Sequence, residues 1–330
     1  MNFKVKLAHG NRGEESSELV SEIFYSAFEN SMLSQQEDAT PLDGHNLVMS
    51  TDSFTVTPLF FSGGDIGKLS ICGTCNDIAM MGAKPKYLTC SVIIEEGFEI
   101  SELKKIVESM QSELACNGAK IVAGDTKVVP RGSVDKIFIN TTGVGEIIKQ
   151  GMSANNLQEG DVILLSRDIG AHGATLFCQR EGIELSSSIQ SDCASLFPSV
   201  EKLINENIEI VAMRDATRGG VAGVLNEWAR QSNVCIKIQE NAIKIEDEVM
   251  GVCELLGFDA LSLANEGTFV LAVKKEYALK SLELLKGFHS NASVIGEVTL
   301  KERGKVILNS EWGSSRYLDM PYGELLPRIC

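Results

Sequence analysis

The sequence predicts a mixed α/β protein with two domains, and two observations lead to this fold class. Runs of apolar and β-branched residues, which predict strands, alternate along the chain with amphipathic stretches, which predict helices. A length of 330 residues is sufficient for two hydrophobic cores. Because the pattern restarts around residue 150, we expect domains at residues 1–149 and 150–318, followed by a flexible tail at 319–330.

In the first half, strands are predicted where apolar runs are bounded by turn residues. One long stretch, residues 100–118, predicts an amphipathic helix with Ile106 and Met110 on its apolar face. Ser101 is the expected N-cap of this helix, and Gly118 marks its expected end. The predicted strands are residues 46–56, 119–124 and 136–147.

The second half repeats this alternation. Residues 159–166 predict a turn followed by a buried strand, and residues 268–273 predict another buried strand. A hairpin turn is expected at residues 302–305. The predicted helices are residues 174–182, 219–231 and 276–288.

Charge and composition exclude several classes of function. The formal net charge is −15, and nucleic acid is an unexpected partner because phosphate binding needs a basic face. The sequence has no apolar leader segment and no run of about 18 apolar residues, so we expect a protein that is neither secreted nor membrane-spanning. Nine cysteines in such a chain indicate reduced thiols and a cytoplasmic location. The pair Cys72 and Cys75 has CxxC spacing, but two small buried side chains are favoured over a zinc site.

Acidic residues recur beside small polar residues at predicted strand ends. Asp52, Asp77 and Asp125 are the three examples, with Asn76 before the second and Thr126 after the third. Carboxylates that converge from three such positions would suit Mg²⁺, which takes oxygen ligands and shares them with phosphate. The alternative is that Asp and Asn simply favour turns.

A glycine-rich segment, "FFSGGDIGKL", occupies residues 60–69. It is not a P-loop, because Ser62 stands where the motif needs glycine and Leu69 where it needs Ser or Thr. Backbone amides freed by Gly63, Gly64 and Gly67 could nevertheless cradle phosphates, and Lys68 ends the segment.

Three further polar residues stand beside glycines. Arg218 begins a predicted helix and could bind an anion there, although Asp215 and Thr217 next to it are equally suited to be helix caps. His172 lies at another helix start, where a structural role is the more common one. Glu266 occupies a tight turn before a buried strand and would act as a base only with a substrate nearby.

The last residue of the sequence is Cys330. A thiol at this position is either an accident of composition or a nucleophile carried on a flexible arm. Composition and spacing leave both readings open.

Taken in order, the segments resemble the hydrogenase-maturation carbamoyl dehydratases, the HypE family, within the wider superfamily of aminoimidazole ribonucleotide synthetase and selenophosphate synthetase. The resemblance covers essentially the whole chain, and its most specific element is the C-terminal "PRIC". The motifs that carry it are "STDSF", "PLFFSGGDIGKL", "CGTCNDIAMMGAKP", "GDTKV", "INTTGVGEI", "DIGAHGAT", "RDATRGGV", "VCELLGFDAL", "ANEGTFVLAV" and "LPRIC".

This resemblance implies a two-domain fold like that of aminoimidazole ribonucleotide synthetase, with a homodimer and a nucleotide site formed by the N-terminal domain. It also implies an enzyme that uses ATP and Mg²⁺. In the family, the terminal thiol, Cys330 here, accepts a carbamoyl group from the carbamoyltransferase HypF. ATP-dependent dehydration then gives an S-cyanide, which passes to iron on the HypC–HypD scaffold and becomes a ligand of [NiFe] hydrogenase.

The resemblance also assigns roles to residues. The expected metal ligands are Asp52, Asp77 and Asp125. The expected nucleotide-binding residues are Gly63, Gly64, Lys68, Asn76 and Thr126. The expected catalytic residues are Cys330, Glu266, Lys127, His172 and Arg218, with Glu266 and Lys127 handling the amide protons.

One segment departs from the family pattern, because Asn11-Arg12-Gly13 stands where a glycine pair is usual. Arginine does not adopt positive φ as readily as glycine, which puts any glycine-dependent mobility there in doubt. Two alternatives to the dehydratase remain open. One is another ATP-dependent synthetase of the superfamily, such as selenophosphate synthetase, although residues 7–13 contain no cysteine to act as its nucleophile. The other is a nucleotide-binding thiol carrier without catalytic activity.

Overall fold

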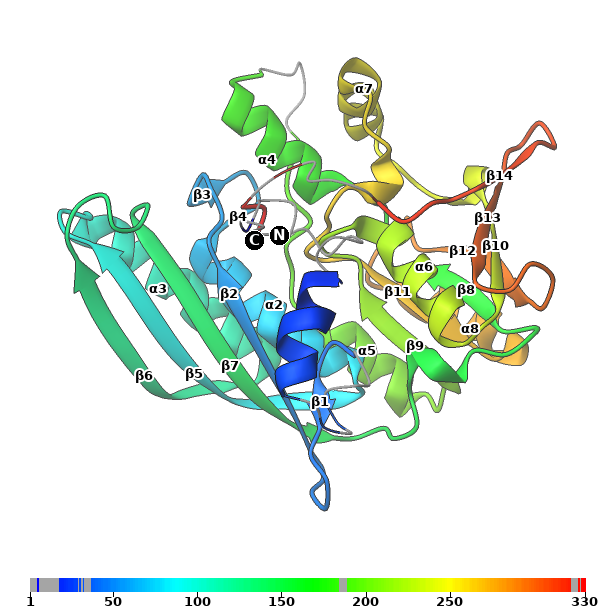
Figure 1. The fold of residues 1–330 in the computed structure, drawn as a ribbon, viewed down its shortest axis with the longest axis horizontal. Helices are drawn as coiled ribbons and strands as arrows, with labels where there is room; N and C mark the ends of the chain where they lie inside the picture. Colours follow the sequence, from blue (N-terminus) through cyan, green and yellow to red (C-terminus); the bar gives the residue numbers. More distant parts are fainter. Residues whose placement is uncertain are drawn as a thin grey trace.

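The structure is a computed structural model, and it describes residues 5, 18–28, 30, 32, 37–183, 189–321, 326 and 328–330. The segment around Arg12 lies outside the described residues. The mixed α/β fold class is confirmed: two sheets lie side by side, each covered by helices (Figure 1). The chain end at Cys330 lies between the two halves, close to β3 and β4 (Figure 1).

The N-terminal half contains a five-stranded sheet in the order β1-β2-β7-β5-β6. Only β5 and β6 run parallel, and helices α2 and α3 lie on one face of the sheet. The strands are β1 (Thr40–Pro41), β2 (Leu47–Phe54), β5 (Ala83–Glu95), β6 (Lys120–Val129) and β7 (Ile137–Ile147), with a small hairpin of β3 (Phe60–Phe61) and β4 (Gly64–Asp65). The helices are η2 (Val20–Tyr25), α2 (Ile66–Met80) and α3 (Ile100–Asn117).

Helix α3 shows how the sequence pattern sets local structure. Its apolar face buries Ile106 and Met110, as predicted, and it ends at Gly118 with φ of 65°, which glycine adopts without strain. The predicted N-cap is wrong. The helix begins at Ile100, so Glu99 holds the cap position and Ser101 lies inside the first turn.

The C-terminal half contains a seven-stranded sheet in the order β14-β13-β10-β12-β8-β11-β9. Its strands are β8 (Val162–Leu165), β9 (Ile210–Asp215), β10 (Cys235–Gln239), β11 (Phe269–Val273), β12 (Ser293–Thr299), β13 (Lys305–Asn309) and β14 (Ser315–Tyr317). Short turns of helix lie at η4 (Ala154–Asn156), η5 (Glu240–Ala242), η6 (Ala260–Ser262) and η7 (Lys275–Tyr277). The longer helices are α4 (Ala171–Glu181), α5 (Phe197–Asn205), α6 (Gly220–Gln231), α7 (Asp247–Leu256) and α8 (Ala278–Lys286).

Alternate residues of β8 pack on opposite sides of this sheet. Ile163 and Leu165 contact the core shared with α4, α6 and α7, whereas Val162 and Leu164 contact the core shared with α5 and α8. The predicted turn at residues 302–305 is present, but it does not form a hairpin. Strand β10 lies between β12 and β13 and pairs with both.

One hydrophobic core runs through both halves. It contains Phe54 and Ile71 of the N-terminal half together with Leu165 and Trp228 of the C-terminal half, and Ile329 of the tail belongs to it as well. The two sheets are therefore fixed relative to each other by continuous apolar packing.

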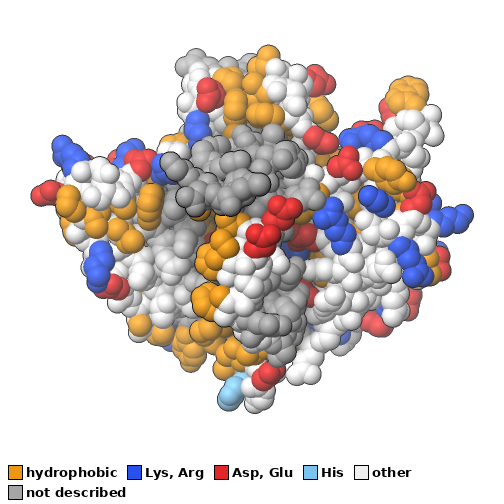
Figure 2. All heavy atoms as spheres, viewed as in Figure 1, with side chains coloured by type: hydrophobic (Ala, Val, Ile, Leu, Met, Phe, Trp, Pro, Cys, Tyr) orange, Lys and Arg blue, Asp and Glu red, His pale blue; other side chains and the backbone are white. Residues whose placement is uncertain are grey.

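The face of the N-terminal sheet opposite α2 and α3 is exposed. Strand β6 is a sheet edge, and nine of its ten residues are exposed. The exposed large hydrophobic residues on this sheet are Met49, Tyr87, Ile93, Ile121, Val122 and Val128, and Figure 2 shows hydrophobic side chains over this part of the molecule. In the part of the chain that the structure describes, no helix is both long and apolar enough to cross a membrane.

Candidate active site

A cavity of about 180 Å³ lies where the two halves meet, between β2 and α2 on one side and β9 and the turn before β11 on the other. It is strongly acidic, and the terminal cysteine reaches into it. Its lining residues are Asp38, Thr51, Asp52, Gly73, Asp77, Asp215, Thr217, Arg218, Glu266 and Cys330. Five of the predicted site residues, Asp52, Asp77, Arg218, Glu266 and Cys330, are therefore brought together.

Three carboxylates in this cavity converge on one point. One oxygen atom from each of Asp38, Asp77 and Asp215 lies within 4.8 Å of the others. Asp77 lies on α2, is half-buried, and accepts a hydrogen bond from Oγ of Ser50 at 2.6 Å. Burial raises the pKa of Asp77 well above its usual range, and the nearby charges of Asp215, Asp38 and Asp52 raise this pKa further. A cluster of carboxylate oxygens with this mutual repulsion suits a divalent cation.

Asp38 is held in place by Arg214, the penultimate residue of β9. Nε of Arg214 lies 3.0 Å from Oδ1 of Asp38, and the same guanidinium pairs with Glu227 and, at 3.7 Å, with Glu37. The carboxylate of Glu37 in turn accepts hydrogen bonds from Oγ of Ser153 at 2.6 Å and from the amide of Ala154 at 3.0 Å. The segment before β1 is thereby tied to the C-terminal half.

Glu266 has the environment of a proton acceptor. It is buried, and its Oε1 atom has no hydrogen-bond partner within the described residues. Burial raises the pKa of Glu266 well above its usual range, and the nearby charges of Asp215 and Asp192 raise it further. The positive charge of Arg218 lowers this pKa in part. Its backbone is fixed because Asp192 accepts hydrogen bonds from the amides of Glu266 and Gly267, at 3.0 and 2.9 Å.

Glycine is required after Glu266. A Cβ atom on Gly267 would lie 1.8 Å from the carbonyl oxygen of Asp192, a distance that no side chain could adopt. The "NEG" turn therefore presses its backbone against Asp192 and points the preceding carboxylate into the cavity.

The end of the chain is docked beside the cavity. The amide of Thr55 donates to the backbone oxygen of Cys330 at 2.9 Å, and Oγ1 of Thr55 donates to the same oxygen at 3.2 Å. Cys330 is half-buried and lines the cavity, whereas Ile329 is buried. His172, which the sequence grouped with the catalytic residues, contacts Ile329 rather than lining the cavity.

The predicted phosphate loop does not line the cavity. Oδ1 of Asp65 accepts hydrogen bonds from the amides of Gly67 and Lys68, so the start of α2 is capped by a carboxylate of its own chain. Nζ of Lys68 donates to the carbonyl oxygen of Gly63 at 3.2 Å. Gly63 is needed for close packing, since a Cβ atom there would lie 2.7 Å from the carbonyl oxygen of Ser191. Gly64 completes the short hairpin.

Asn76 also makes contacts outside the cavity. Its side-chain nitrogen donates to the carbonyl oxygen of Ala194 at 3.0 Å, and its side-chain oxygen accepts from the amide of Leu196 at 2.8 Å. Both ends of the amide thus connect α2 to the segment before α5.

Asp125, Thr126 and Lys127 lie on β6 and are exposed. Strands β7 and β5 separate β6 from β2, so three strand spacings, or about 14 Å, lie between this segment and Asp52. Lys127 pairs with Asp125, and this hydrogen bond lowers the pKa of the Asp125 carboxyl group. Within one chain these three residues do not reach the cavity.

Comparison with known proteins identifies both halves. The chain matches the family model "AIR synthase related protein, N-terminal domain" at residues 36–147 and the model "AIR synthase related protein, C-terminal domain" at residues 158–309. It is 46% identical to carbamoyl dehydratase HypE of Escherichia coli K12 over 336 residues, which is 99% of each chain. It is 41% identical to carbamoyl dehydratase HypE of Rhodobacter capsulatus, covering 99% of this chain and 98% of that one.

Solved structures agree with these relatives. HypE in complex with ATP matches with a TM-score of 0.84 and 43% identity, covering 99% of this chain and 100% of that one. HypE in a HypE–HypF complex matches with a TM-score of 0.88 and 48% identity, covering 92% and 99%. A thiamine monophosphate kinase from Aquifex aeolicus, at 18% identity and a TM-score of 0.68, shares the fold alone.

Proposed function

The chain belongs to the HypE family of carbamoyl dehydratases, and from this premise we propose that its ATP-dependent reaction takes place in the acidic cavity. The observation that carries the proposal is the meeting of Cys330, Glu266 and three converging aspartates in one cavity. The thiol that bears the substrate group, a proton acceptor and a cation site would then be adjacent.

The chemistry to be performed is the removal of water from an S-carbamoyl group. The carbon–oxygen bond is broken, two N–H protons are lost, and the product on Cys330 is an S-cyanide. Amide oxygen is a poor leaving group, and ATP supplies the phosphoryl group that lets this oxygen depart as phosphate. The remaining requirements fall on the protein: it must remove protons and stabilise negative charge as it develops.

Glu266 is the proposed acceptor for the amide protons. Burial raises the pKa of Glu266, and a carboxylate with a raised pKa is a stronger proton acceptor than an exposed one. Arg218 lines the same cavity and would place a guanidinium near the departing phosphate. Thr217 lines the cavity beside it.

Mg²⁺ is the proposed metal cofactor, and its ligands would be Asp38, Asp77 and Asp215, with Asp52 close by. Burial and, after it, the neighbouring carboxylates raise the pKa of Asp77, and a cation would relieve the repulsion among these carboxylates. When bound, the cation would offset the charge of the nucleotide phosphates. Of the metal ligands predicted from the sequence, this set retains Asp77. Asp38 and Asp215 are new members, and Asp52 lines the same cavity without belonging to the set.

A second copy of the chain is the proposed source of Asp125, Thr126 and Lys127. The exposed β6 edge and its apolar residues Val122 and Val128 are features that a partner chain would cover. A homodimer through this sheet would also bring Lys127 towards a cavity other than its own. We assign Gly63, Gly64, Lys68 and Asn76 a structural role from the contacts described above.

The proposed partners follow from the reaction. The known HypE–HypF complex supports HypF as the carbamoyl donor, and the HypC–HypD iron scaffold is the proposed acceptor of cyanide. All nine cysteines are free thiols, which fits a cytoplasmic location.

Intact-mass analysis tests the proposed function. The protein is incubated with the carbamoyltransferase partner, carbamoyl phosphate, ATP and Mg²⁺. We expect a carbamoyl adduct that loses the mass of one water, and we expect no adduct on a Cys330→Ala variant. A Cys330→Ala variant that still accepts carbamoyl would refute the assignment.

A further inference from the structure

Every backbone carbonyl of the last three residues accepts a hydrogen bond from the body of the protein. The carbonyl of Arg328 accepts from the amide of Thr57 at 3.3 Å and from the guanidinium of Arg180. The carbonyl of Ile329 lies 2.8 Å from Nε2 of His172. The backbone oxygen of Cys330 accepts from the amide and hydroxyl groups of Thr55. The docked tail is thus held mainly through its backbone.

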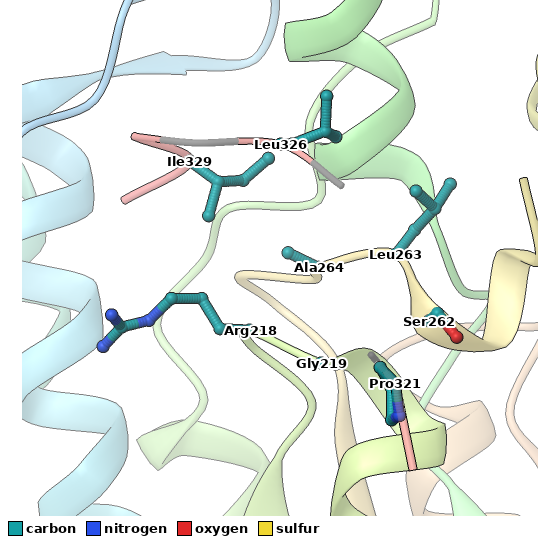
Figure 3. Close-up of a pocket in the computed structure, with 8 residues that line it drawn as sticks. All are labelled: Arg218, Gly219, Ser262, Leu263, Ala264, Pro321, Leu326 and Ile329. Atoms are coloured by element: carbon teal, nitrogen blue, oxygen red, sulfur yellow. The ribbon is translucent and has the colours of Figure 1, made fainter. Parts of the chain in front are cut away.

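The side chains of the tail point in different directions. Arg328 donates from Nε to the carbonyl oxygen of Thr55 at 2.7 Å and from NH1 to Asp135 at 2.6 Å, and its guanidinium lies over the ring of Phe138. Ile329 is buried. Figure 3 shows Ile329 and Leu326 above the turn that carries Leu263 and Ala264, lining a small cavity, while Arg218 extends away from them. Arg328 thus contacts Asp135 and Phe138, Ile329 packs in the hydrophobic core, and Cys330 lines the acidic cavity.

His172 is central to this arrangement, and both of its ring nitrogens are engaged. Nδ1 lies 2.7 Å from Oγ of Ser191, and that oxygen already accepts from the amide of Cys193 at 3.0 Å. The Ser191 hydroxyl proton is therefore available to Nδ1, which leaves the proton on Nε2 to donate to Ile329. Burial lowers the pKa of His172, which favours this neutral form.

We propose that His172, Arg180 and Thr55 form a receptor for the sequence Arg-Ile-Cys at the chain end, and that His172 is a positioning residue of the dehydratase rather than a proton-transfer group. By holding the carbonyl oxygen of Ile329, His172 places the sulfur of Cys330 at the acidic cavity. The proposal deepens the proposed function, because it concerns delivery of the same thiol. It stands apart from that function in one respect, since docking is measurable without any turnover.

The first measurement is docking in the full-length protein. Alkylation of Cys330 by iodoacetamide is followed by mass spectrometry, with exposed Cys116 in the same chain as the internal reference. In His172→Leu the lost hydrogen bond should increase Cys330 labelling by roughly two- to tenfold, relative to Cys116. His172→Gln keeps an N–H near the position of Nε2, so its labelling should stay close to wild type.

The second measurement separates positioning from acid–base chemistry. The S-carbamoylated fraction of each variant is followed through one turnover after addition of ATP and Mg²⁺. His172→Leu should slow conversion by a similar factor, and His172→Gln should restore the rate with an unchanged pH profile. If His172→Gln docks normally yet loses conversion and one limb of the pH profile, His172 is a proton-transfer group and the proposal is wrong.

Asp135 provides a variant that leaves the buried residues untouched. Its side chain is half-exposed, so Asp135→Asn should increase labelling of Cys330 only about two- to fivefold. The reversed pair, Asp135→Arg with Arg328→Asp, should recover docking relative to Arg328→Asp alone. Labelling of Cys330 that is unchanged in His172→Leu and in Asp135→Asn would overturn the receptor.

Discussion

Nε of Arg214 lies 3.0 Å from Oδ1 of Asp38, and both side chains are almost completely buried. This ion pair joins the segment before β1 to the end of β9, next to the point where Asp38, Asp77 and Asp215 converge. The guanidinium of Arg214 forms ion pairs with all three of Glu37, Asp38 and Glu227. It therefore both neutralises this cluster and shapes the proposed metal site.

Arg214→Gln should strongly destabilise the protein. Removal of one partner from a buried ion pair leaves an uncompensated charge and typically costs about 3–5 kcal/mol. Urea unfolding of the variant should show this loss in the free energy of unfolding. The control is Arg230→Gln, at the exposed end of α6, which should change little. Equal effects of the two substitutions would contradict the role given to Arg214.

Glu266→Gln should accumulate S-carbamoylated protein. Glutamine keeps the shape of the side chain but cannot accept a proton, so single-turnover conversion should fall by about 10²–10⁴-fold. In the wild type, conversion should rise with pH through the raised pKa of Glu266, because only the ionised carboxylate can act as a base. Glu283→Gln, on the exposed face of α8, is the matched control. Wild-type conversion by Glu266→Gln would assign the base to another group.

Asp77→Asn should change the pH dependence of stability. The folded-state pKa of Asp77 is raised, so the folded protein binds its proton more tightly than the unfolded chain does. This stabilisation is complete below the unfolded pKa of about 4 and is lost as pH rises through the raised folded pKa. In metal-free protein, the melting temperature of Asp77→Asn relative to wild type should therefore increase between mildly acidic and neutral pH.

Binding of Mg²⁺ should offset the loss of stability that ionised Asp77 causes at neutral pH. Mg²⁺ should raise the melting temperature of the wild type at neutral pH and have less effect on Asp77→Asn, because the variant offers one carboxylate fewer. ATP turnover should weaken in parallel. An identical response of both proteins to Mg²⁺ and EDTA would argue against Asp77 as a ligand.

Mixed dimers should reveal whether Lys127 acts across an interface. Lys127→Ala and Cys330→Ala should each be inactive alone. If a second copy supplies Lys127, a heterodimer purified through two different tags contains one site with both residues and should regain about half of the wild-type conversion per dimer. A heterodimer without activity would place Lys127 and Cys330 of the same chain in one site, whereas wild-type activity of Lys127→Ala alone would remove Lys127 from the reaction.

The fold class followed from the sequence because each half has a regular apolar pattern. The helix around Ile106 and the strand containing Asp52 were predictable from local spacing alone, and both are present. The false hairpin at residues 302–305 shows the limit of such spacing. Two strands joined by a tight turn can be separated by a third strand from elsewhere in the chain, and here that strand is β10.

The sequence predicted cavity residues correctly where a family motif lies next to the cavity. It failed where the order of strands in the sheet determines whether a residue reaches the cavity. The predicted residues Asp52, Asp77 and Glu266 all line the cavity, and their roles stay predictions. Asp125 belongs to a similar motif, but β6 lies at the far edge of the sheet, and no local pattern encodes that order. Asp38 follows no strand, so nothing in its neighbourhood signals a ligand. Asp215 was read as a helix cap, although its place at the end of β9 was a usable signal.

The burial of Leu326 and Ile329 has a consequence for the working cycle of the enzyme. Removing two such side chains from water favours the docked arm by about 3–6 kcal/mol. Ordering the five residues from 326 to 330 costs about 5–10 kcal/mol of backbone entropy, and the hydrogen bonds to Thr55 and His172 offset part of this cost. On these figures, a released state of the arm would lie within a few kcal/mol of the docked one. Small differences in the free energy with which the cavity binds a bare thiol, a carbamoyl group or a cyanide would then decide whether the arm stays docked or is released to another protein. The chemical state of one sulfur atom would thus select the partner of the arm at each step.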